Sequence, residues 1–126
     1  MSEYIAKKYS DKMKGAKVLE LGCGPALVGI VCGKMGAASV ITTDHEDLVL
    51  GLAKQNVEQN DLSDIVKVEK LCWGELCNDT YDFIIGSEVT YASDDWNQLA
   101  TTISSGANSK CRVILSEAKR WLDVCI

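Results

Sequence analysis

Segments with the apolar pattern of buried β-strands alternate along this chain with segments whose apolar residues recur at helical spacing. Strands are predicted at 17–21, 39–43, 65–71, 81–88 and 111–117, and helices at 3–14, 27–36, 47–60 and 94–105. Helical crossovers allow consecutive strands to run parallel, and their right-handedness distributes the helices over both faces of the sheet. The pattern predicts an α/β fold, a doubly wound, Rossmann-like and mostly parallel sheet.

The predicted helix over 47–60 illustrates the local expectations. Leu48, Leu52 and Val57 are assigned to its apolar face, and Asp47 is expected to cap its start. Ligands of doubly wound sheets bind beyond the carboxyl ends of the strands, so functional residues are expected directly after strands.

Length and charge restrict the classes of function. The chain has 126 residues, enough for one domain over 1–126, and a formal net charge of −5. No cluster of basic residues is visible in the sequence, so nucleic acid is not an expected partner. No apolar run approaches the ~18–20 residues that span a bilayer, and residues 1–15 lack the apolar segment of a secretory signal. We therefore expect no membrane partner.

The six cysteines form no C-x-x-C pair, and the only histidine is His45. Zinc binding and a disulfide framework are both disfavoured by this spacing, although it does not exclude metal ligands. We expect reduced, mainly structural thiols in a cytoplasmic protein, with the nucleus as a second location. The cysteines are Cys23, Cys32, Cys72, Cys77, Cys111 and Cys125.

A glycine turn follows the first predicted strand. Gly22 and Gly24 allow a sharp turn and a close approach of a ligand to the backbone. A nicotinamide-type fingerprint would have a third glycine at position 27, where this chain has leucine. The carboxylate of Glu20 suits a ligand with an ammonium or sulfonium group better than a pyrophosphate. The alternative is a glycine turn that holds no ligand.

Asp44 directly follows the second predicted strand, 20 residues after Gly24. A carboxylate there can accept both ribose hydroxyls of an adenosine-containing ligand, and His45 could pack on the ligand's edge. The alternatives are a helix cap for Asp44 and an idle surface side chain for His45.

These residues, with Trp73-Gly74 after the third strand and the segment YDFIIGSEVTY at 81–91, resemble the class I S-adenosylmethionine-dependent methyltransferases. Within them, the chain is similar to the seven-β-strand protein-lysine/histidine N-methyltransferases. The resemblance covers about residues 15–120. It implies S-adenosyl-L-methionine as cofactor and S-adenosyl-L-homocysteine as product. It also implies a chain truncated after the fifth strand and incomplete at both ends.

The resemblance assigns roles residue by residue. Glu20, Gly22 and Gly24 would line the methionine part of the cofactor, Asp44 would hold the ribose, and Trp73 would lie against the adenine. Trp73 could instead fill the core. The remaining expected cofactor-binding residues are Cys23, His45 and Ser87.

Glu88 departs from the family pattern, because lysine-directed members usually have aspartate there. The segment Ser-Glu-Val-Thr-Tyr is nearer to the histidine-directed branch. We expect Glu88 and Tyr91 to be catalytic, with Glu88 orienting an amine or imidazole and helping to take its proton. Tyr91 would shape the acceptor channel. A cap or surface charge for Glu88, and simple packing for Tyr91, are the alternatives.

The expected function is methyl transfer from S-adenosylmethionine to a lysine, or a histidine, side-chain nitrogen of a protein substrate. Two other functions stay open. One is a catalytically silent domain that binds cofactor or acts as a scaffold, and the other is a nucleotide-dependent oxidoreductase.

Overall fold

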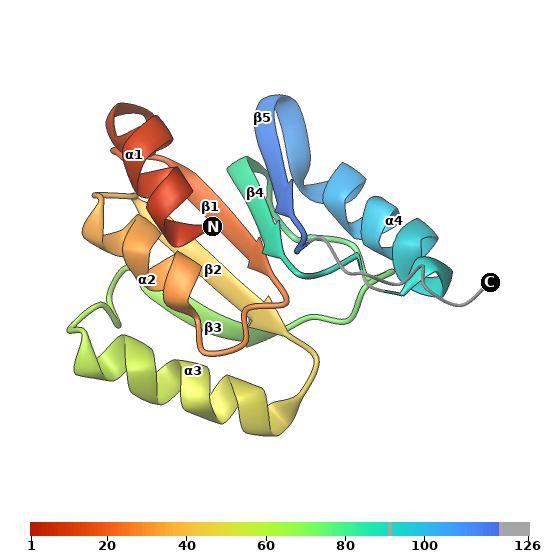
Figure 1. Cartoon of the computed structure of the whole chain (residues 1–126), viewed down its shortest axis with the longest axis horizontal. Coiled ribbons are helices and arrows are strands. Elements are labelled where there is room, and N and C mark those ends of the chain that lie inside the picture. The colour runs from red at the N-terminus through yellow and green to blue at the C-terminus, as the bar shows by residue number, and fades with distance from the viewer. Residues whose placement is uncertain (91, 119–126) are drawn as a thin grey trace.

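A single parallel sheet of five strands forms the centre of the computed structural model, which describes residues 1–90 and 92–118 (Figure 1). The strand order is β3-β2-β1-β4-β5 and every neighbouring pair is parallel. The strands are β1 Lys17–Leu21, β2 Ser39–Asp44, β3 Val66–Lys70, β4 Tyr81–Ser87 and β5 Ala107–Ser116. The predicted doubly wound α/β fold is confirmed.

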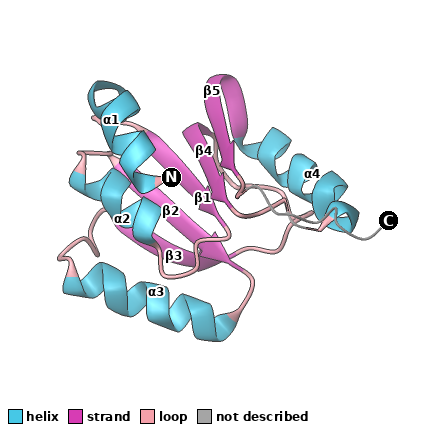
Figure 2. Ribbon diagram, viewed as in Figure 1, coloured by secondary structure: helices cyan, strands magenta, loops and turns pink. Residues whose placement is uncertain are grey.

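Helices cover both faces of this sheet (Figure 2). Three helices, α1 Ser2–Met13, α2 Leu27–Lys34 and α3 Asp47–Gln59, pack on one face. The opposite face is covered by α4 Trp96–Gly106, which follows the 3-10 turn η1 Ser93–Asp95. Side chains of successive β1 residues enter the two cores in turn: Val18 packs with α1 and α2, and Leu19 packs on the α4 side.

The buried face of α3 differs from the prediction. Leu48 is 90% exposed and Leu52 is 48% exposed, whereas Leu50, Ala53 and Val57 are buried. Residues three or four positions apart lie on the same face of a helix, so the side chains at positions 50, 53 and 57 form one stripe. Positions 52 and 57 are five residues apart and do not share such a stripe.

Helix α3 begins at Asp47 as predicted, but Asp47 is not its cap. Glu46 occupies the cap position, and the Asp47 carboxylate pairs with Lys70 at 2.9 Å. Strand β5 begins four residues earlier than predicted, directly after Gly106 at the end of α4. Among the described residues, no helix combines the length and apolar character needed to cross a bilayer.

Candidate functional site

A cavity of about 530 Å³ opens where β1, β2 and β4 end, at the centre of the sheet. This is the edge at which doubly wound sheets hold their ligands, and the volume is typical of a small-molecule site. Seven of the ten predicted site residues line it: Gly22, Gly24, Asp44, His45, Trp73, Ser87 and Glu88. Tyr91 lies outside the described residues, so its predicted role stays a prediction.

Glycine is required at positions 22 and 24 of the turn for different structural reasons. Gly22 has a φ of 63°, and a Cβ there would lie 2.8 Å from Cγ1 of Val89, so its missing side chain makes room for the loop after β4. Gly24 has a φ of 51°, and a Cβ would meet no protein atom within 4 Å. Because Gly24 lines the cavity, it is the glycine that leaves space for a ligand.

The turn continues through Ala26, whose role the sequence analysis missed. Ala26 is fully buried at the cap of α2 and has a φ of 64° and a ψ of 28°, a left-handed conformation that favours glycine. The backbone from Gly22 to Ala26 is therefore an irregular, left-handed cradle rather than a simple reverse turn.

Asp44 is held at the end of β2 by backbone donors. One carboxylate oxygen accepts a hydrogen bond from the Gly24 N–H at 3.2 Å, and the other accepts from the N–H groups of His45 at 2.8 Å and Glu46 at 3.3 Å. The side chain is 12% exposed. This carboxylate joins the glycine turn to the segment before α3 and also lines the cavity, whereas the cap position of α3 belongs to Glu46. Its predicted role toward a ribose stays a prediction.

His45 lies between two carboxylates. Its Nδ1 is 3.3 Å from Asp44 and its Nε2 is 3.6 Å from Glu46, and its side chain is 63% exposed. It lines the cavity, and its expected packing on the edge of a ligand stays a prediction.

Glu20 is not among the residues that line the cavity, and its expected contact with the cofactor stays a prediction. Its carboxylate is buried behind the glycine turn, where one oxygen accepts hydrogen bonds from the Thr42 hydroxyl and from the Gly29 N–H at 3.0 Å. Burial raises the pKa of Glu20 to about 7, although these two hydrogen bonds oppose the increase. Glu20 thus connects β1, β2 and α2.

Cys23 is also absent from the cavity lining. It is 6% exposed, and burial raises the pKa of its thiol to about 12, as expected for a structural rather than a reactive cysteine. The cysteine that does line the cavity is Cys72, which is exposed.

The position of Trp73 is compatible with both interpretations of this residue, a place against the adenine and a place in the core. The indole is half-buried, packs against the core on the α4 side and lines the cavity. Its Cζ2 is 3.9 Å from the position that a Cβ on Gly22 would occupy. The indole thus packs on the core and borders the cavity, an arrangement that suits a stacked purine.

The loop after β4 is held by the segment that ends β5. Glu88 has a φ of 59°, its N–H donates to the Ser116 carbonyl at 2.8 Å, and its carboxylate accepts from the Ala118 N–H. The Thr90 N–H in turn donates to the Glu117 carboxylate at 2.6 Å. A left-handed conformation at a non-glycine residue is strained, and such strain is concentrated at functional sites.

Seven other lining residues were not predicted as site residues. They come from the start of α3, the segment after β3, the loop after β4 and the start of α4: Glu46, Val49, Leu71, Cys72, Val89, Asp95 and Gln98. Their sequence signal was their position within a few residues of a strand's carboxyl end or at the start of the helix that follows.

Among the described lining residues, the charged side chains at neutral pH are all acidic. Asp44, Glu46, Glu88 and Asp95 contribute carboxylates, and no lysine or arginine lines the cavity there. Such a cavity favours a cationic ligand and disfavours a pyrophosphate.

Comparison with known proteins agrees with this geometry. A family model described as "Lysine methyltransferase" matches residues 1–123. The chain belongs to the lysine methyltransferase family. It is 32% identical over 114 residues to protein N-lysine methyltransferase METTL21A of Xenopus tropicalis, covering 86% of this chain and 52% of that protein. It is 33% identical over 109 residues to calmodulin-lysine N-methyltransferase of Arabidopsis thaliana, covering 79% of this chain and 36% of that protein.

Solved structures show the same fold for this lysine methyltransferase family member. A putative S-adenosyl-L-methionine-dependent methyltransferase of Methanococcus maripaludis superposes with a TM-score of 0.81 at 15% identity, over 93% of this chain and 53% of that one. A methyltransferase of Thiobacillus denitrificans in complex with S-adenosyl-L-homocysteine gives 0.74 at 16% identity, over 91% and 48%. The chain spans about half the length of METTL21A and less of the calmodulin-lysine enzyme.

Proposed function

We propose that the protein transfers a methyl group from S-adenosyl-L-methionine to a lysine, or a histidine, side-chain nitrogen of a protein substrate. One observation carries the proposal: a glycine cradle, a ribose-type carboxylate and an indole surround a cavity whose charged groups at neutral pH are all acidic. Membership of the lysine methyltransferase family supports the same reaction.

The residues present fit the cofactor. Gly24 leaves open space beside the turn, Asp44 accepts hydrogen bonds at a position suited to two ribose hydroxyls, and Trp73 offers an indole face for the adenine. The carboxylates favour the sulfonium and ammonium charges of this cofactor. When bound, S-adenosyl-L-methionine supplies an electrophilic methyl group on sulfur.

The acceptor side is assigned to the loop after β4. Glu88 lines the cavity and is held in a strained conformation by the end of β5. We assign it the role of orienting the acceptor nitrogen and receiving its proton, because transfer requires an unprotonated nitrogen. Asp95 also lines the cavity, where its charge would attract an ammonium group. The rest of the reaction is alignment of the acceptor nitrogen and exclusion of water.

A labelling experiment tests the reaction. The protein is incubated with a cell extract and S-adenosyl-L-methionine carrying a labelled methyl group, and labelled proteins are digested and analysed by mass spectrometry. Label on a lysine or histidine nitrogen, lost in the Asp44→Ala variant, is the expected result. Binding of S-adenosyl-L-homocysteine without any transfer would favour the silent cofactor-binding domain, and binding of a nicotinamide dinucleotide instead would favour the oxidoreductase.

A further inference from the structure

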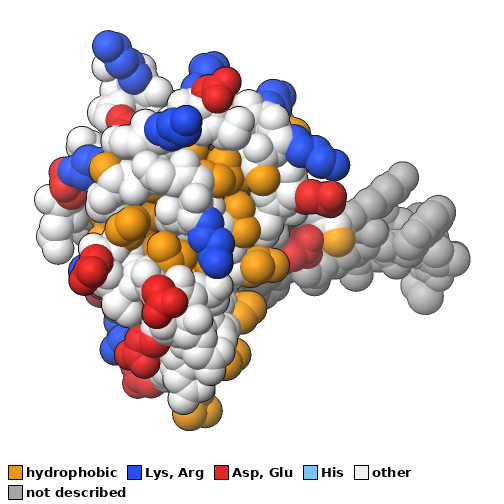
Figure 3. All heavy atoms as spheres, turned by 90° about the vertical axis from the view of Figure 1, so that its left-hand side faces the viewer, with side chains coloured by type: hydrophobic (Ala, Val, Ile, Leu, Met, Phe, Trp, Pro, Cys, Tyr) orange, Lys and Arg blue, Asp and Glu red, His pale blue; other side chains and the backbone are white. Residues whose placement is uncertain are grey.

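Positive charge gathers around α1 and β5, although the protein as a whole is acidic. The segments 2–17 and 107–116 together contain seven of the 13 lysines and arginines but only two of the 18 acidic residues, Glu3 and Asp11. In the view of Figure 3, lysine and arginine side chains gather along the upper edge, where α1 lies, and acidic side chains predominate towards α3. The charge distribution is therefore strongly asymmetric.

Four side chains between α1 and β5 form a cluster of aromatic rings and cations, here called the tyrosine–cation cluster: Tyr4, Lys8, Tyr9 and Arg112. The Lys8 ammonium donates to the Tyr4 hydroxyl at 2.9 Å and lies 5.3 Å from the centre of that ring. The Tyr4 and Tyr9 rings meet edge to face, with centroids 6.0 Å apart. Tyr4 is 46% exposed, so the cluster is open to solvent.

Both cations lie over the same ring. Lys8 Nζ and the Arg112 guanidinium carbon are each 5.8 Å from the centre of the Tyr9 ring. Tyr9 is only 9% exposed and packs edge to face on Phe83 of β4 at 5.6 Å, which fixes the ring to the sheet. The two cations are thus held in place by a rigid part of the core, and less side-chain freedom would be lost when they bind a partner.

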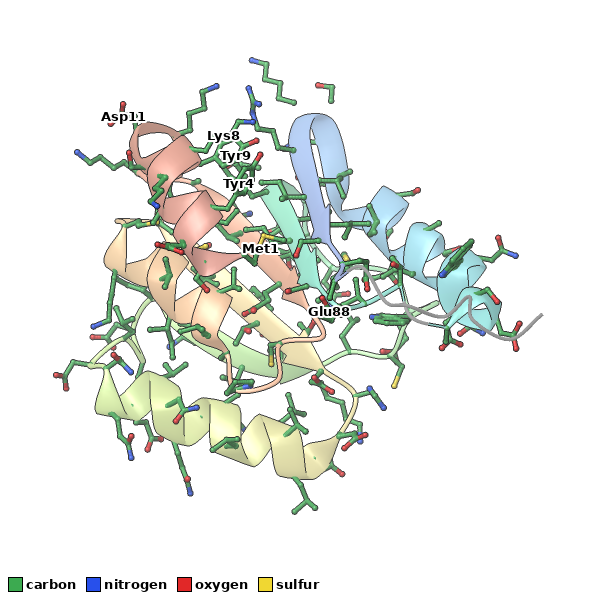
Figure 4. All side chains as sticks on the ribbon, viewed as in Figure 1. Met1, Tyr4, Lys8, Tyr9, Asp11 and Glu88 are labelled. Carbon is green, nitrogen blue, oxygen red and sulfur yellow. The ribbon has the colours of Figure 1, made fainter. Side chains whose placement is uncertain are left out.

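No carboxylate of the described residues neutralises this pair. Within residues 1–90 and 92–118, the lysines that form ion pairs are Lys7, Lys17 and Lys70, and neither Lys8 nor Arg112 is within ion-pair distance of an aspartate or glutamate. Figure 4 shows Tyr4, Lys8 and Tyr9 on the side of α1 that faces β5, whereas Asp11 lies on the opposite side. The pKa of the Tyr4 phenol is lowered, mainly because Lys8 donates to its oxygen, so negative charge is favoured at this place.

We propose that the tyrosine–cation cluster is a docking surface for an acidic segment of a partner protein. Arginine and tyrosine are the residue types that contribute most at protein–protein interfaces, and two fixed cations match carboxylates that follow one another along a chain. A nucleic acid fits less well, since two cations neutralise few phosphates and the rest of the protein is acidic. None of the four residues lines the cavity, so docking is independent of the proposed methyl transfer.

Fluorescence anisotropy tests the proposal with three probes at low salt: a labelled oligoglutamate peptide, an oligoglutamine peptide of the same length and a single-stranded oligothymidylate. The parent protein is expected to bind the oligoglutamate more tightly than the other two. The double variant Lys8→Met, Arg112→Met keeps unbranched apolar stems but loses both charges, and should bind about tenfold more weakly. Lys54→Met, on the exposed face of α3, serves as the control and should bind as the parent does.

Affinity for S-adenosyl-L-homocysteine, measured in each variant, separates loss of docking from loss of the fold or of the proposed cofactor site. That affinity should be the same in the parent, the double variant and the control. Three results would overturn the docking surface: no binding of oligoglutamate by the parent, equal binding by the double variant, or tighter binding of oligothymidylate than of oligoglutamate.

Discussion

The buried carboxylate of Glu20 should make the stability of this protein fall as the pH rises. Its ordinary pKa of 4.5 is raised to about 7 by burial, so folding favours the protonated form. The stabilisation is complete below about pH 4.5 and is lost as the pH rises through about 7. The difference between the two pKa values corresponds to about 3 kcal/mol, which is a large part of the stability of a typical domain.

The glutamine variant isolates this effect. Glu20→Gln keeps the shape of the side chain and an oxygen that can accept from Thr42 and Gly29, but it cannot ionise. Urea unfolding followed by circular dichroism, from about pH 5 to about pH 8.5, should show the parent losing about 2–3 kcal/mol relative to this variant. Glu58→Gln, an exposed carboxylate on α3, should keep the pH dependence of the parent.

Two results would refute the reasoning on Glu20. If Glu20→Gln and the parent showed the same pH dependence, burial would not have raised the pKa of this carboxylate. If the parent gained stability relative to the variant as the pH rose, the carboxylate would be held ionised, and the hydrogen bonds from Thr42 and Gly29 would outweigh its burial.

Three substitutions at the cavity give further predictions. Asp44→Ala should weaken S-adenosyl-L-homocysteine binding at least about tenfold in calorimetry, because two charge-assisted hydrogen bonds are lost, whereas Asp47→Ala, on the outer side of α3, should not. Gly24→Ala and Gly15→Ala both place a Cβ at positive φ in space free of protein atoms, so the melting temperatures of the two variants should fall by similar amounts. Only Gly24→Ala should weaken S-adenosyl-L-homocysteine binding, and equal affinities of the two variants would mean that the ligand does not lie beside Gly24. Glu88→Gln should leave binding within a few-fold of the parent but slow methyl transfer about 100-fold in the labelling assay, and full turnover would remove its proposed proton-transfer role.

Sequence periodicity was sufficient to predict the fold, because the alternation of strand and helix leaves few topologies. It also located the cavity, since Gly24, Asp44 and Glu88 each lie at or just after the carboxyl end of a strand, and these ends must lie at the same edge of the sheet. The sequence motif around the glycine turn could not by itself distinguish residues that face the cavity from residues that support the turn from behind. Glu20 has the position of a cofactor ligand in the sequence, but its side chain points behind the turn to Gly29 and Thr42.

Other features depend on contacts between distant segments. The need for glycine at position 22 comes from Val89 in a loop that follows another strand. The tyrosine–cation cluster joins Lys8 of α1 to Arg112 of β5, and no local run of basic residues in the sequence predicts it. Burial of Leu50 rather than Leu48 depends on how α3 lies on the sheet, which a single apolar stripe does not determine.

A titration of the isotopically labelled protein with S-adenosyl-L-homocysteine, followed by amide NMR, tests the central claim most directly, because it reports both binding and place. The account predicts that the largest changes occur at the amides of Gly22, Gly24 and Asp44 and at the indole N–H of Trp73, all of which lie at the cavity. Resonances of the tyrosine–cation cluster should not change. Absence of binding, or changes confined to residues away from the carboxyl ends of β1, β2 and β4, would contradict the account.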